Sequence, residues 1–309
     1  MRTASCESWF QNRSSGPDLQ EDGPKSLAGS NELWTESMSV NCAAGIDVAI
    51  LGAVRQEVEP LFHLLGSPRV FDFRGEALHL GHFQERSILI GSTGLGKVNA
   101  AITTAAILET FGAAQVWNVG CAGAYEGGPL DVGDVLISRT VICGDEGVLS
   151  RNGVESMRTI GIPLVKRDGE PLFDCFPLAE GSWAYERVLR LTPAGLYTID
   201  GGRLQLVKAG ENDRKPKGEV FRTLHGPSLT VSLASGDRKT AGKRRQRYGA
   251  LAENMEGSAM AQTCARYEVP FLECRAMSNI AGHRDKREWR LEPAFERCCA
   301  VIRHWLEGD

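Results

Sequence analysis

Residues 253–257 read Glu-Asn-Met-Glu-Gly, and residues 269–279 read Val-Pro-Phe-Leu-Glu-Cys-Arg-Ala-Met-Ser-Asn. The first stretch places two carboxylates and an amide in a short loop, from which a run with helical spacing leads to Tyr267. The second is an apolar strand that ends in the polar pair Ser278 and Asn279. Loops at strand ends meet at one crevice in an open α/β sheet, so these polar groups are expected to converge on a ligand. A helix cap followed by an ordinary turn is the competing interpretation.

The chain upstream alternates between strands and helices in the same way. Ile46–Leu51 is predicted to be a strand, and Arg55–Leu65 carries apolar residues at helical spacing. Glu57 lies in the first turn of that helix, just beyond the carboxyl end of the strand. It either complements the helix dipole or takes part in the chemistry that open α/β sheets place at strand ends.

A glycine-containing loop, residues 92–99, leads from an apolar strand into the alanine-rich helix predicted at Ala100–Phe111. Glycines at a helix N-terminus let backbone N–H groups approach an anion or a hydroxyl. The loop fits neither the dinucleotide-binding nor the P-loop pattern, since no second glycine stands at the required spacing before Lys97. The strand before the loop, Ser87–Ile90, is predicted to pair in antiparallel fashion with Ala77–Phe83.

Small residues and acidic residues follow two further predicted strands. Residues 120–124 leave room for a flat ligand against the backbone, although tight packing of a helix on a strand asks for the same residues. Asp145 and Glu146 are either substrate ligands or solvated loop charges. The remaining predicted elements are the strands Gln115–Val119, Val135–Cys143, Leu204–Lys208 and Leu229–Leu233, the helix Tyr185–Leu191 and the loop Gly210–Gly218.

The composition is that of a soluble globular protein of 309 residues with a net charge of -4. This charge gives no general attraction to nucleic acid or to anionic membranes, so the basic run 238–247 is predicted to be a solvated helix face. Nine cysteines without a Cys-x-x-Cys pair indicate reduced thiols. The sequence shows neither a bilayer-spanning apolar run nor a secretory signal, and it therefore predicts a cytoplasmic location.

The first 44 residues are rich in Ser, Asn, Gly, Glu and Asp and have no sustained apolar period. Residues 1–44 are therefore predicted to be a disordered or non-native N-terminal extension, with Met38 as an alternative start. Residues 45–309 are predicted to form a single domain.

The sequence contains five motifs in this order: Gly52-Ala53 with Glu57, residues 93–97 (Thr-Gly-Leu-Gly-Lys), 118–123 (Asn-Val-Gly-Cys-Ala-Gly), 132–134 (Val-Gly-Asp), and 254–257 with 275–279. Together they resemble the nucleoside phosphorylase and nucleosidase superfamily. The chain is similar in particular to the futalosine hydrolase branch, through residues 253–257, 273–275 and 282–285 together with Trp289. The resemblance implies an α/β fold with three α/β/α layers around a central mixed sheet, usually assembled as a homo-oligomer. It also implies a small-molecule nucleoside as substrate and no cofactor; no group of histidines has the spacing of metal ligands.

The resemblance implies a role for each matching residue. Glu57 matches the acid that activates water in related nucleosidases, and Glu256 matches the acid that hydrogen-bonds the ribose hydroxyls. A carboxylate on the 2'-hydroxyl helps to spread the positive charge that develops at C1' as the glycosidic bond breaks. The other implied substrate-binding residues are Thr93, Gly94, Cys121, Ala122 and Asn254, with Met255 as the apolar floor under the sugar.

Asn279 departs from the adenine-specific members of the superfamily, in which an aspartic acid stands at this position. Its NH2 can donate to O6 of a purine while its carbonyl accepts from a protonated N7. A carboxylate would instead face O6 as acceptor against acceptor. Asn279 therefore favours a 6-oxopurine leaving group, such as the hypoxanthine of futalosine.

The expected activity is hydrolysis of futalosine to release hypoxanthine, a step of menaquinone biosynthesis. The benzoate of futalosine needs a cationic partner, for which Arg284 is the first candidate and Arg275 the second. Arg55 lies near Glu57 in the sequence and keeps a phosphate-using enzyme open. The alternatives are a methylthioadenosine or adenosylhomocysteine nucleosidase, a 6-oxopurine nucleoside phosphorylase, and a non-catalytic nucleoside-binding protein.

Overall fold

The computed structural model describes residues 45–308, apart from 152, 168, 179–182 and 208–217. These residues belong to one compact unit, Ala44–Asp309. The predictions for residues 1–44 and for most of the loop Gly210–Gly218 fall outside the described residues. Within the described residues, no helix is both long enough and apolar enough to span a membrane.

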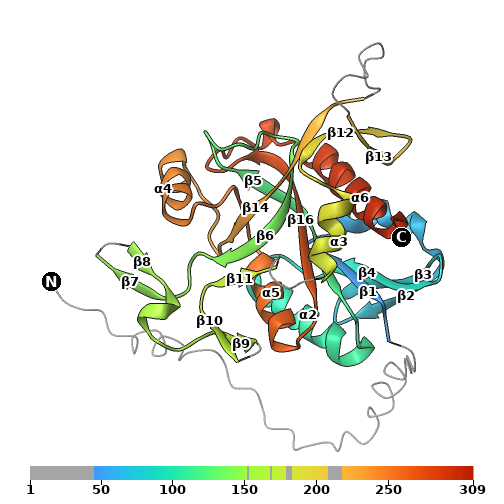
Figure 1. Ribbon diagram of the computed structural model, residues 1–309, viewed down its shortest axis with the longest axis horizontal. Coiled ribbons are helices and arrows are strands. Elements are labelled where there is room, and N and C mark those ends of the chain that lie inside the picture. Colours follow the sequence, from blue (N-terminus) through green and yellow to red (C-terminus); the bar gives the residue numbers. More distant parts are fainter. Residues whose placement is uncertain (1–44, 152, 168, 179–182, 208–217, 309) are drawn as a thin grey trace, which may run out of the picture. The chain divides into compact units, whose positions relative to one another are not determined.

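One large mixed sheet forms the centre of this unit (Figure 1). Its order is β13-β12-β14-β6-β16-β5-β1-β4-β3-β2, and two short strands, β11 and β15, pair with it in addition. Two hairpins lie outside the sheet, β7–β8 and β9–β10. The strand bounds are β1 (Val48–Gly52), β2 (Gly66–Phe73), β3 (Glu76–Phe83), β4 (Arg86–Ser92), β5 (Val116–Ala124), β6 (Val135–Cys143), β7 (Val148–Ser150), β8 (Gly153–Glu155), β9 (Val165–Arg167), β10 (Glu170–Leu172), β11 (Cys175–Pro177), β12 (Gly195–Asp200), β13 (Arg203–Leu206), β14 (Phe221–Thr230), β15 (Ala252–Asn254) and β16 (Phe271–Ile280).

Helices cover both faces of this sheet. In β5, Trp117 packs edge-on against Trp305 of α6, while the next residue, Asn118, bonds to the Glu273 side chain beside the start of α5. Because neighbouring residues of a strand point to opposite faces, α6 and the start of α5 lie on opposite sides, as the three-layer prediction requires. The helix bounds are α1 (Arg55–Val58), α2 (Lys97–Phe111), α3 (Trp183–Leu191), α4 (Arg238–Tyr248), α5 (Gly257–Arg266) and α6 (Leu291–Glu307), with 3-10 helices η2 (Glu59–Leu64), η3 (Met157–Thr159) and η4 (Lys286–Glu288).

Four neighbouring strands, β4, β1, β5 and β16, run in the same direction. All five residues of β1 are buried, as are the first eight of β16, which is typical of parallel strands covered on both faces. The carboxyl ends of these strands therefore lie along one edge of the sheet. The loop after β4 bonds to the end of β1 there, since the N–H of Thr93 donates to the carbonyl of Gly52, and the polar end of β16 lies along the same edge.

The helix predicted at Arg55–Leu65 is only partly α-helical. It consists of one α-helical turn, α1, and continues as the 3-10 helix η2. Pro60 stands at the start of η2 and has no N–H to donate to the preceding turn, so it ends the α-helical pattern.

The strand predicted at Leu229–Leu233 is wrong in its bounds, because β14 begins at Phe221 and ends at Thr230. Its pairing with β6 shifts register between Gly226 and Pro227. A proline inside a strand is accommodated at such an irregularity, and it hides the strand in the sequence. β2 and α6 were not predicted from the sequence, whereas β6 has the predicted bounds.

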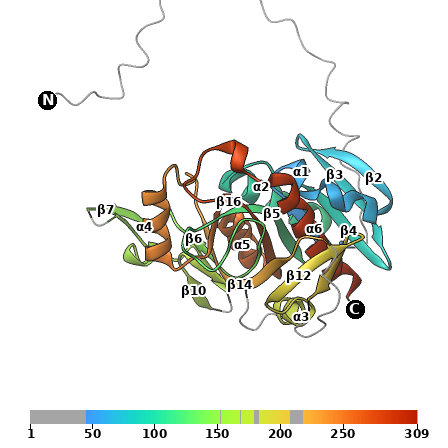
Figure 2. The ribbon, with the colours of Figure 1, turned by 90° about the horizontal axis from the view of Figure 1, so that it is seen from above.

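The hairpins β2–β3 and β7–β8 lie on opposite sides of the unit in both ribbon views (Figure 2).

The loop after β16 is held by a close backbone contact at Gly282. Its φ is +87°, and a Cβ at this position would lie 2.5 Å from the carbonyl oxygen of Asp237. This contact fixes the segment that follows Asn279 against the start of α4.

Gly282→Ala is therefore expected to destabilise the fold by about 2 kcal/mol, through a positive φ and a clash with a backbone oxygen. Denaturant unfolding measures the change. Gly242→Ala in α4, where a Cβ meets nothing within 4 Å, is the control and should stabilise the fold by about 0.5–1 kcal/mol. Equal effects of the two substitutions would contradict the contact.

Candidate active site

Glu57 is the first charged group of the site, and it is buried with 3% exposure. Its Oε2 accepts hydrogen bonds from the backbone N–H groups of Ala53 (2.7 Å) and Val54 (3.3 Å). Its Oε1 accepts from the N–H of Cys121 in β5, at 2.8 Å. These donors offset the cost of burying the carboxylate and tie the end of β1 to β5.

Arg275 of β16 lies beside Glu57 and is fully buried. A Cβ placed on Gly120 would come within 2.3 Å of Glu57 Oε1 and 2.9 Å of Arg275 Nη1, so both groups lie over the same glycine. On its other side, Arg275 Nη2 is 3.7 Å from Glu256 Oε2. Arg275 Nη1 is buried and has no hydrogen-bond partner among the described residues. One arginine therefore faces both Glu57, the predicted base, and Glu256, the predicted ribose-binding acid, and keeps a donor free.

Glu256 directly precedes α5 without a capping hydrogen bond from its side chain, and it joins two of the predicted loops. Its Oε1 accepts from the N–H of Gly96, at 3.0 Å, in the glycine-containing loop. The amide oxygen of Asn254 accepts from the N–H groups of Glu256 (3.1 Å) and Gly257 (2.8 Å). The helix-cap interpretation thus applies to Asn254, which leaves the Glu256 carboxylate directed toward Arg275. Burial raises the pKa of Glu256, and the charge of Arg275 opposes the rise.

Thr93 and Gly94 follow β4 at the same edge of the sheet. Thr93 is buried, and its N–H donates to the carbonyl of Gly52 at 2.8 Å. Gly94 has φ +83° and is half-buried, so its backbone turns sharply above the end of the strand. Contacts of these two residues with a substrate remain a prediction.

Lys97 forms ion pairs with Asp145 and Glu146, which the sequence allowed as either substrate ligands or solvated loop charges. Its ammonium is 2.6 Å from Asp145 Oδ1 and 2.9 Å from Glu146 Oε1. The pKa of Lys97 is raised because these hydrogen bonds outweigh the effect of burial. Asp145 and Glu146 therefore anchor the start of α2 to the end of β6.

Asn279 follows an irregularity in β16, where the pairing with β5 shifts register between Met277 and Asn279. The hydroxyl of Ser278, between them, donates to Asn279 Oδ1 at 2.9 Å, and Asn279 Nδ2 donates to the carbonyl of Ile280 at 3.0 Å. Each polar atom of the half-buried amide can still form one more hydrogen bond. Bulges commonly direct side chains toward functional sites.

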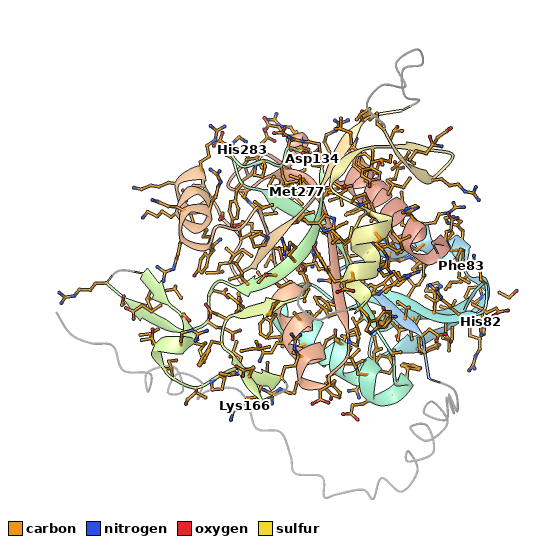
Figure 3. The ribbon with its side chains drawn as sticks, in the orientation of Figure 1. His82, Phe83, Asp134, Lys166, Met277 and His283 are labelled. Carbon is orange, nitrogen blue, oxygen red and sulfur yellow. The ribbon has the colours of Figure 1, made fainter. Side chains whose placement is uncertain are left out.

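Asp134 and Met277 lie side by side just before this bulge (Figure 3). The N–H of Met277 donates to the carbonyl of Asp134 at 2.8 Å, and the N–H of Gly133 donates to the carbonyl of Met277 at 2.7 Å. Arg297 of α6 also donates to the carbonyl of Gly133. The Val132-Gly133-Asp134 motif therefore fixes the strand that carries Asn279.

Cys121 and Ala122 form part of β5 beside Glu57 and Ser278. The N–H of Cys121 binds Glu57, and the carbonyl of Ala122, 3.4 Å from the Ser278 hydroxyl, is a longer alternative acceptor to Asn279 Oδ1 for its single proton. Burial and the nearby Glu57 charge raise the pKa of the Cys121 thiol, so the sulfur is neutral and is not a thiolate nucleophile. Through Cys121 and Ser278, the structure links Glu57 to Asn279.

The two arginines predicted for a substrate carboxylate have different surroundings. Arg284 is exposed in the loop after β16, with its guanidinium 5.1 Å from the ring centre of Trp289. Arg275 already faces Glu256 and Glu273, so it is a poor partner for a third carboxylate. The role of Arg284 remains a prediction. Among the described residues, no group of three or more His, Cys, Asp or Glu side chains could hold a metal ion.

The buried group formed by Asn118, Glu273 and Arg275 was not predicted from the sequence, in which Arg275 was a candidate only for binding a substrate carboxylate. A signal was present, since β16 carries two charged residues at positions 273 and 275 within an apolar run. Residues two apart in a strand share a face, so an opposite-charge pair at this spacing indicates a buried ionic group.

Comparisons with known proteins agree with this architecture. The phosphorylase superfamily model matches residues 47–307. A 5'-methylthioadenosine/S-adenosylhomocysteine nucleosidase of Chromohalobacter salexigens is 31% identical over 236 residues, 76% of this chain and 85% of that protein. A futalosine hydrolase of Thermus thermophilus is 31% identical over 220 residues, 70% of this chain and 80% of that protein.

A solved structure gives the same fold. The 5'-methylthioadenosine/S-adenosylhomocysteine nucleosidase of Colwellia psychrerythraea, in complex with adenine, superposes with a TM-score of 0.65 at 22% identity. The match covers 85% of this chain and 95% of that one. Fold and site geometry define an α/β protein with a buried carboxylate–arginine cluster at the carboxyl edge of its sheet. The chain belongs to the phosphorylase superfamily.

Proposed function

We propose that the protein hydrolyses the N-glycosidic bond of a purine nucleoside with water activated by Glu57. The observation that carries the proposal is the shared burial of Glu57, Arg275 and Glu256 at one edge of the sheet. Relatives named as nucleosidases and as a futalosine hydrolase support the reaction class. The retention of Glu57, Glu256 and Asn279 in one structure argues against a purely binding role.

The proposed step forms a bond between water oxygen and C1' and breaks the bond between C1' and the base nitrogen. Glu57 accepts a proton from the water and later returns it to solvent, while the bonding electrons leave with the base, which takes up a proton from solvent. Glu256 accepts a hydrogen bond from a ribose hydroxyl and stabilises the developing charge at C1'. The free Nη1 of Arg275 can orient the water beside Glu57.

The charges of the site favour hydrolysis over phosphorolysis. Glu57 and Glu256 both face Arg275, so a phosphate ion at this position would meet two carboxylates. Arg55, the cation that kept phosphorolysis open, is exposed and paired with Glu59 at 3.0 Å. We therefore retain water as the proposed nucleophile.

The proposed leaving group is a 6-oxopurine, and the proposed substrate is futalosine. Asn279 supports this choice because its amide can donate to O6 and accept from N7–H. The 31% identity with the futalosine hydrolase of Thermus thermophilus is in keeping with it. Hydrolysis of methylthioadenosine or adenosylhomocysteine is the alternative, supported by the 31% identity with the nucleosidase of Chromohalobacter salexigens.

A homo-oligomer also remains part of the proposal. Leu95, Val98 and Ile102 are large apolar side chains exposed at and just before the start of α2, next to the glycine-containing loop. An apolar surface of this kind suits contact with a second copy of the chain.

The deciding experiment offers the enzyme futalosine, inosine and methylthioadenosine, each with and without phosphate, and follows base release by chromatography. Hypoxanthine release from futalosine without phosphate is the expected result. A strict phosphate requirement would indicate a phosphorylase, and preferred release of adenine would indicate the alternative nucleosidase. Binding of the base without any turnover would indicate a non-catalytic protein.

The raised pKa of Glu256 predicts the acid side of the pH profile. The carboxylate form is the one that binds the ribose hydroxyl, so kcat/KM should fall as pH decreases through this pKa. The midpoint should lie above about 4.3, the ordinary value for glutamate. Initial rates at saturating and limiting nucleoside measure it, and the midpoint should move in Glu256→Gln. An unmoved midpoint would assign the titration to another group.

A further inference from the structure

Glu273 is a fully buried carboxylate that the proposed reaction does not use. Its Oε1 accepts hydrogen bonds from the hydroxyls of Ser138 (2.7 Å) and Ser228 (2.5 Å). Its Oε2 accepts from Asn118 Nδ2 at 3.0 Å and from Arg275 Nη2 at 3.3 Å. Three strands besides its own thus supply donors to one buried side chain, β5, β6 and β14.

The surroundings of Glu273 fix its position closely. A Cβ on Gly257 would lie 2.1 Å from Glu273 Oε2, so the start of α5 needs glycine there to make room for the carboxylate. Arg275 also donates its Nε to the same oxygen, at 3.3 Å. Glu273 therefore accepts hydrogen bonds from Nε and Nη2 of the guanidinium, while Nη1 has no hydrogen-bond partner in the described part of the chain.

We propose that Glu273 is a positioning residue that holds the Arg275 guanidinium away from Glu256 and so keeps the Glu256 carboxylate available for the ribose. Arg275 Nη2 stands 3.3 Å from Glu273 Oε2 and 3.7 Å from Glu256 Oε2, so the two carboxylates compete for one donor. The inference rests on the proposed function, since it concerns the group that binds the sugar.

The charges around Arg275 come from several elements. Glu273 shares its strand, Glu256 stands before α5, Glu57 belongs to α1, and the neutral thiol of Cys121 lies on β5. Burial disfavours the charged guanidinium, but the three carboxylates raise its pKa, so Arg275 stays a cation. Glu256 faces Arg275 and, more weakly, Glu57. Loss of the charge at position 273 should therefore move Arg275 toward Glu256 and lower the pKa of Glu256.

Glu273→Gln tests this inference. We expect kcat to fall about 10- to 100-fold, because a small displacement of a catalytic group is costly, with a much smaller change in KM. The acid midpoint of kcat/KM should move to lower pH by about one unit. Carbon-13 NMR titration of labelled glutamate carboxyls, with the Glu256 signal identified from its loss in Glu256→Gln, should show the same shift without substrate.

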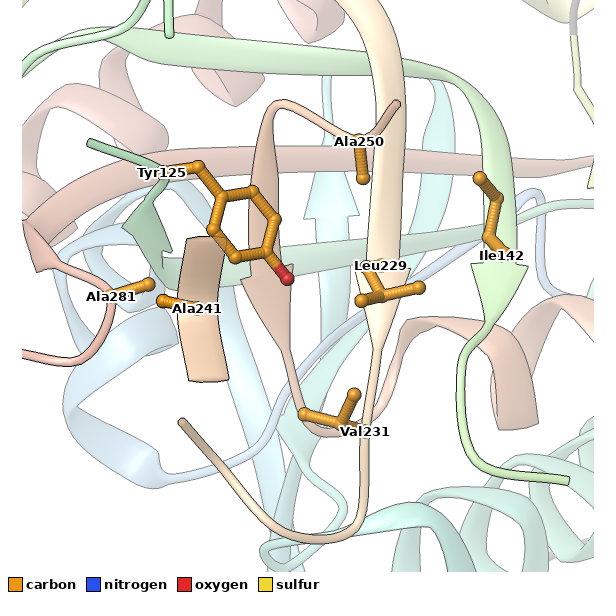
Figure 4. Close-up of a cluster of buried hydrophobic side chains, with 7 residues drawn as sticks. All are labelled: Tyr125, Ile142, Leu229, Val231, Ala241, Ala250 and Ala281. Atoms are coloured by element: carbon orange, nitrogen blue, oxygen red, sulfur yellow. The ribbon is translucent and has the colours of Figure 1, made fainter. Parts of the chain in front are cut away.

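Glu253→Gln is the matched control. Glu253 is also a buried carboxylate, and it accepts hydrogen bonds from Tyr125 (3.0 Å) and from the N–H and hydroxyl of Ser235 (both 2.7 Å). Tyr125 belongs to an apolar cluster with Leu229 and Val231 (Figure 4). This variant should lose stability but keep the acid midpoint of the wild type.

The outcomes separate the two proposals. A wild-type enzyme that releases no base from any nucleoside would end the proposed function, whatever the variants do. A wild-type enzyme that is active, with a Glu273→Gln variant that only melts at a lower temperature, would make Glu273 structural and overturn the inference. An acid midpoint that stays in place or moves to higher pH would also overturn it.

Discussion

Glu57→Gln is expected to lower kcat about 10²- to 10⁴-fold while leaving the affinity for the nucleoside nearly unchanged. The amide cannot accept a proton from water, so the attacking oxygen loses its base. The proposed ribose and base contacts come from other elements, among them the loop that carries Glu256, and they should persist. Single-turnover kinetics and isothermal calorimetry with the substrate measure the two quantities.

This variant also has a structural cost that must be measured beside its kinetics. The Glu57 carboxylate accepts from N–H groups on both sides, so an amide NH2 must face one of those donors. Thermal unfolding reports that cost. Glu59→Gln, two residues along, is the control, because Glu59 is exposed and bonds to Arg55. Unchanged turnover in Glu57→Gln would remove this residue from the mechanism.

Asn279→Asp is expected to shift the preference between 6-oxopurine and 6-aminopurine nucleosides by about 100-fold in the ratio of kcat/KM values. A carboxylate would set acceptor against acceptor at O6 but could accept from a 6-amino group. The change also removes the hydrogen bond from Nδ2 to the carbonyl of Ile280, so both rates should fall to some degree. The ratio is therefore the informative quantity.

Inosine and adenosine, or futalosine and its 6-amino analogue, provide the matched substrates for this comparison. Asn279→Ala is the control, since it removes both hydrogen bonds of the amide and should lower both rates without reversing the preference. If Asn279→Asp keeps the wild-type ratio, the amide does not select the base, and another group must do so.

The sequence predicted the elements whose apolar residues are continuous or regularly spaced. β1 is buried along its whole length and β6 is buried except at Arg139 and Thr140, and the positions of both strands could be read directly from the chain. Pro60 ended an α-helix that the apolar spacing predicted to continue, and Pro227 hid the first part of a strand. Proline has this effect because it removes a backbone donor that regular structure uses.

Single polar residues at strand ends could be predicted as members of the candidate site, whereas the hydrogen-bond network around Glu273 could not. Glu57, Glu256 and Asn279 stand at strand ends, where polar residues are noticeable. Glu273, in contrast, acquires its surroundings from Asn118, Ser138 and Ser228, which are up to 155 positions away in the chain. Only the register of β5, β6, β14 and β16 brings these groups together.

The hydrogen bonds that join Glu57 to the ends of β1 and β5 have an evolutionary consequence. A descendant of this protein that had lost its catalytic role would still need a carboxylate there to close the two strands. Natural selection for folding alone would then preserve the residue. The presence of this glutamate alone in a distant homologue therefore indicates an intact scaffold, and turnover has to be inferred from its combination with Glu256 and Asn279.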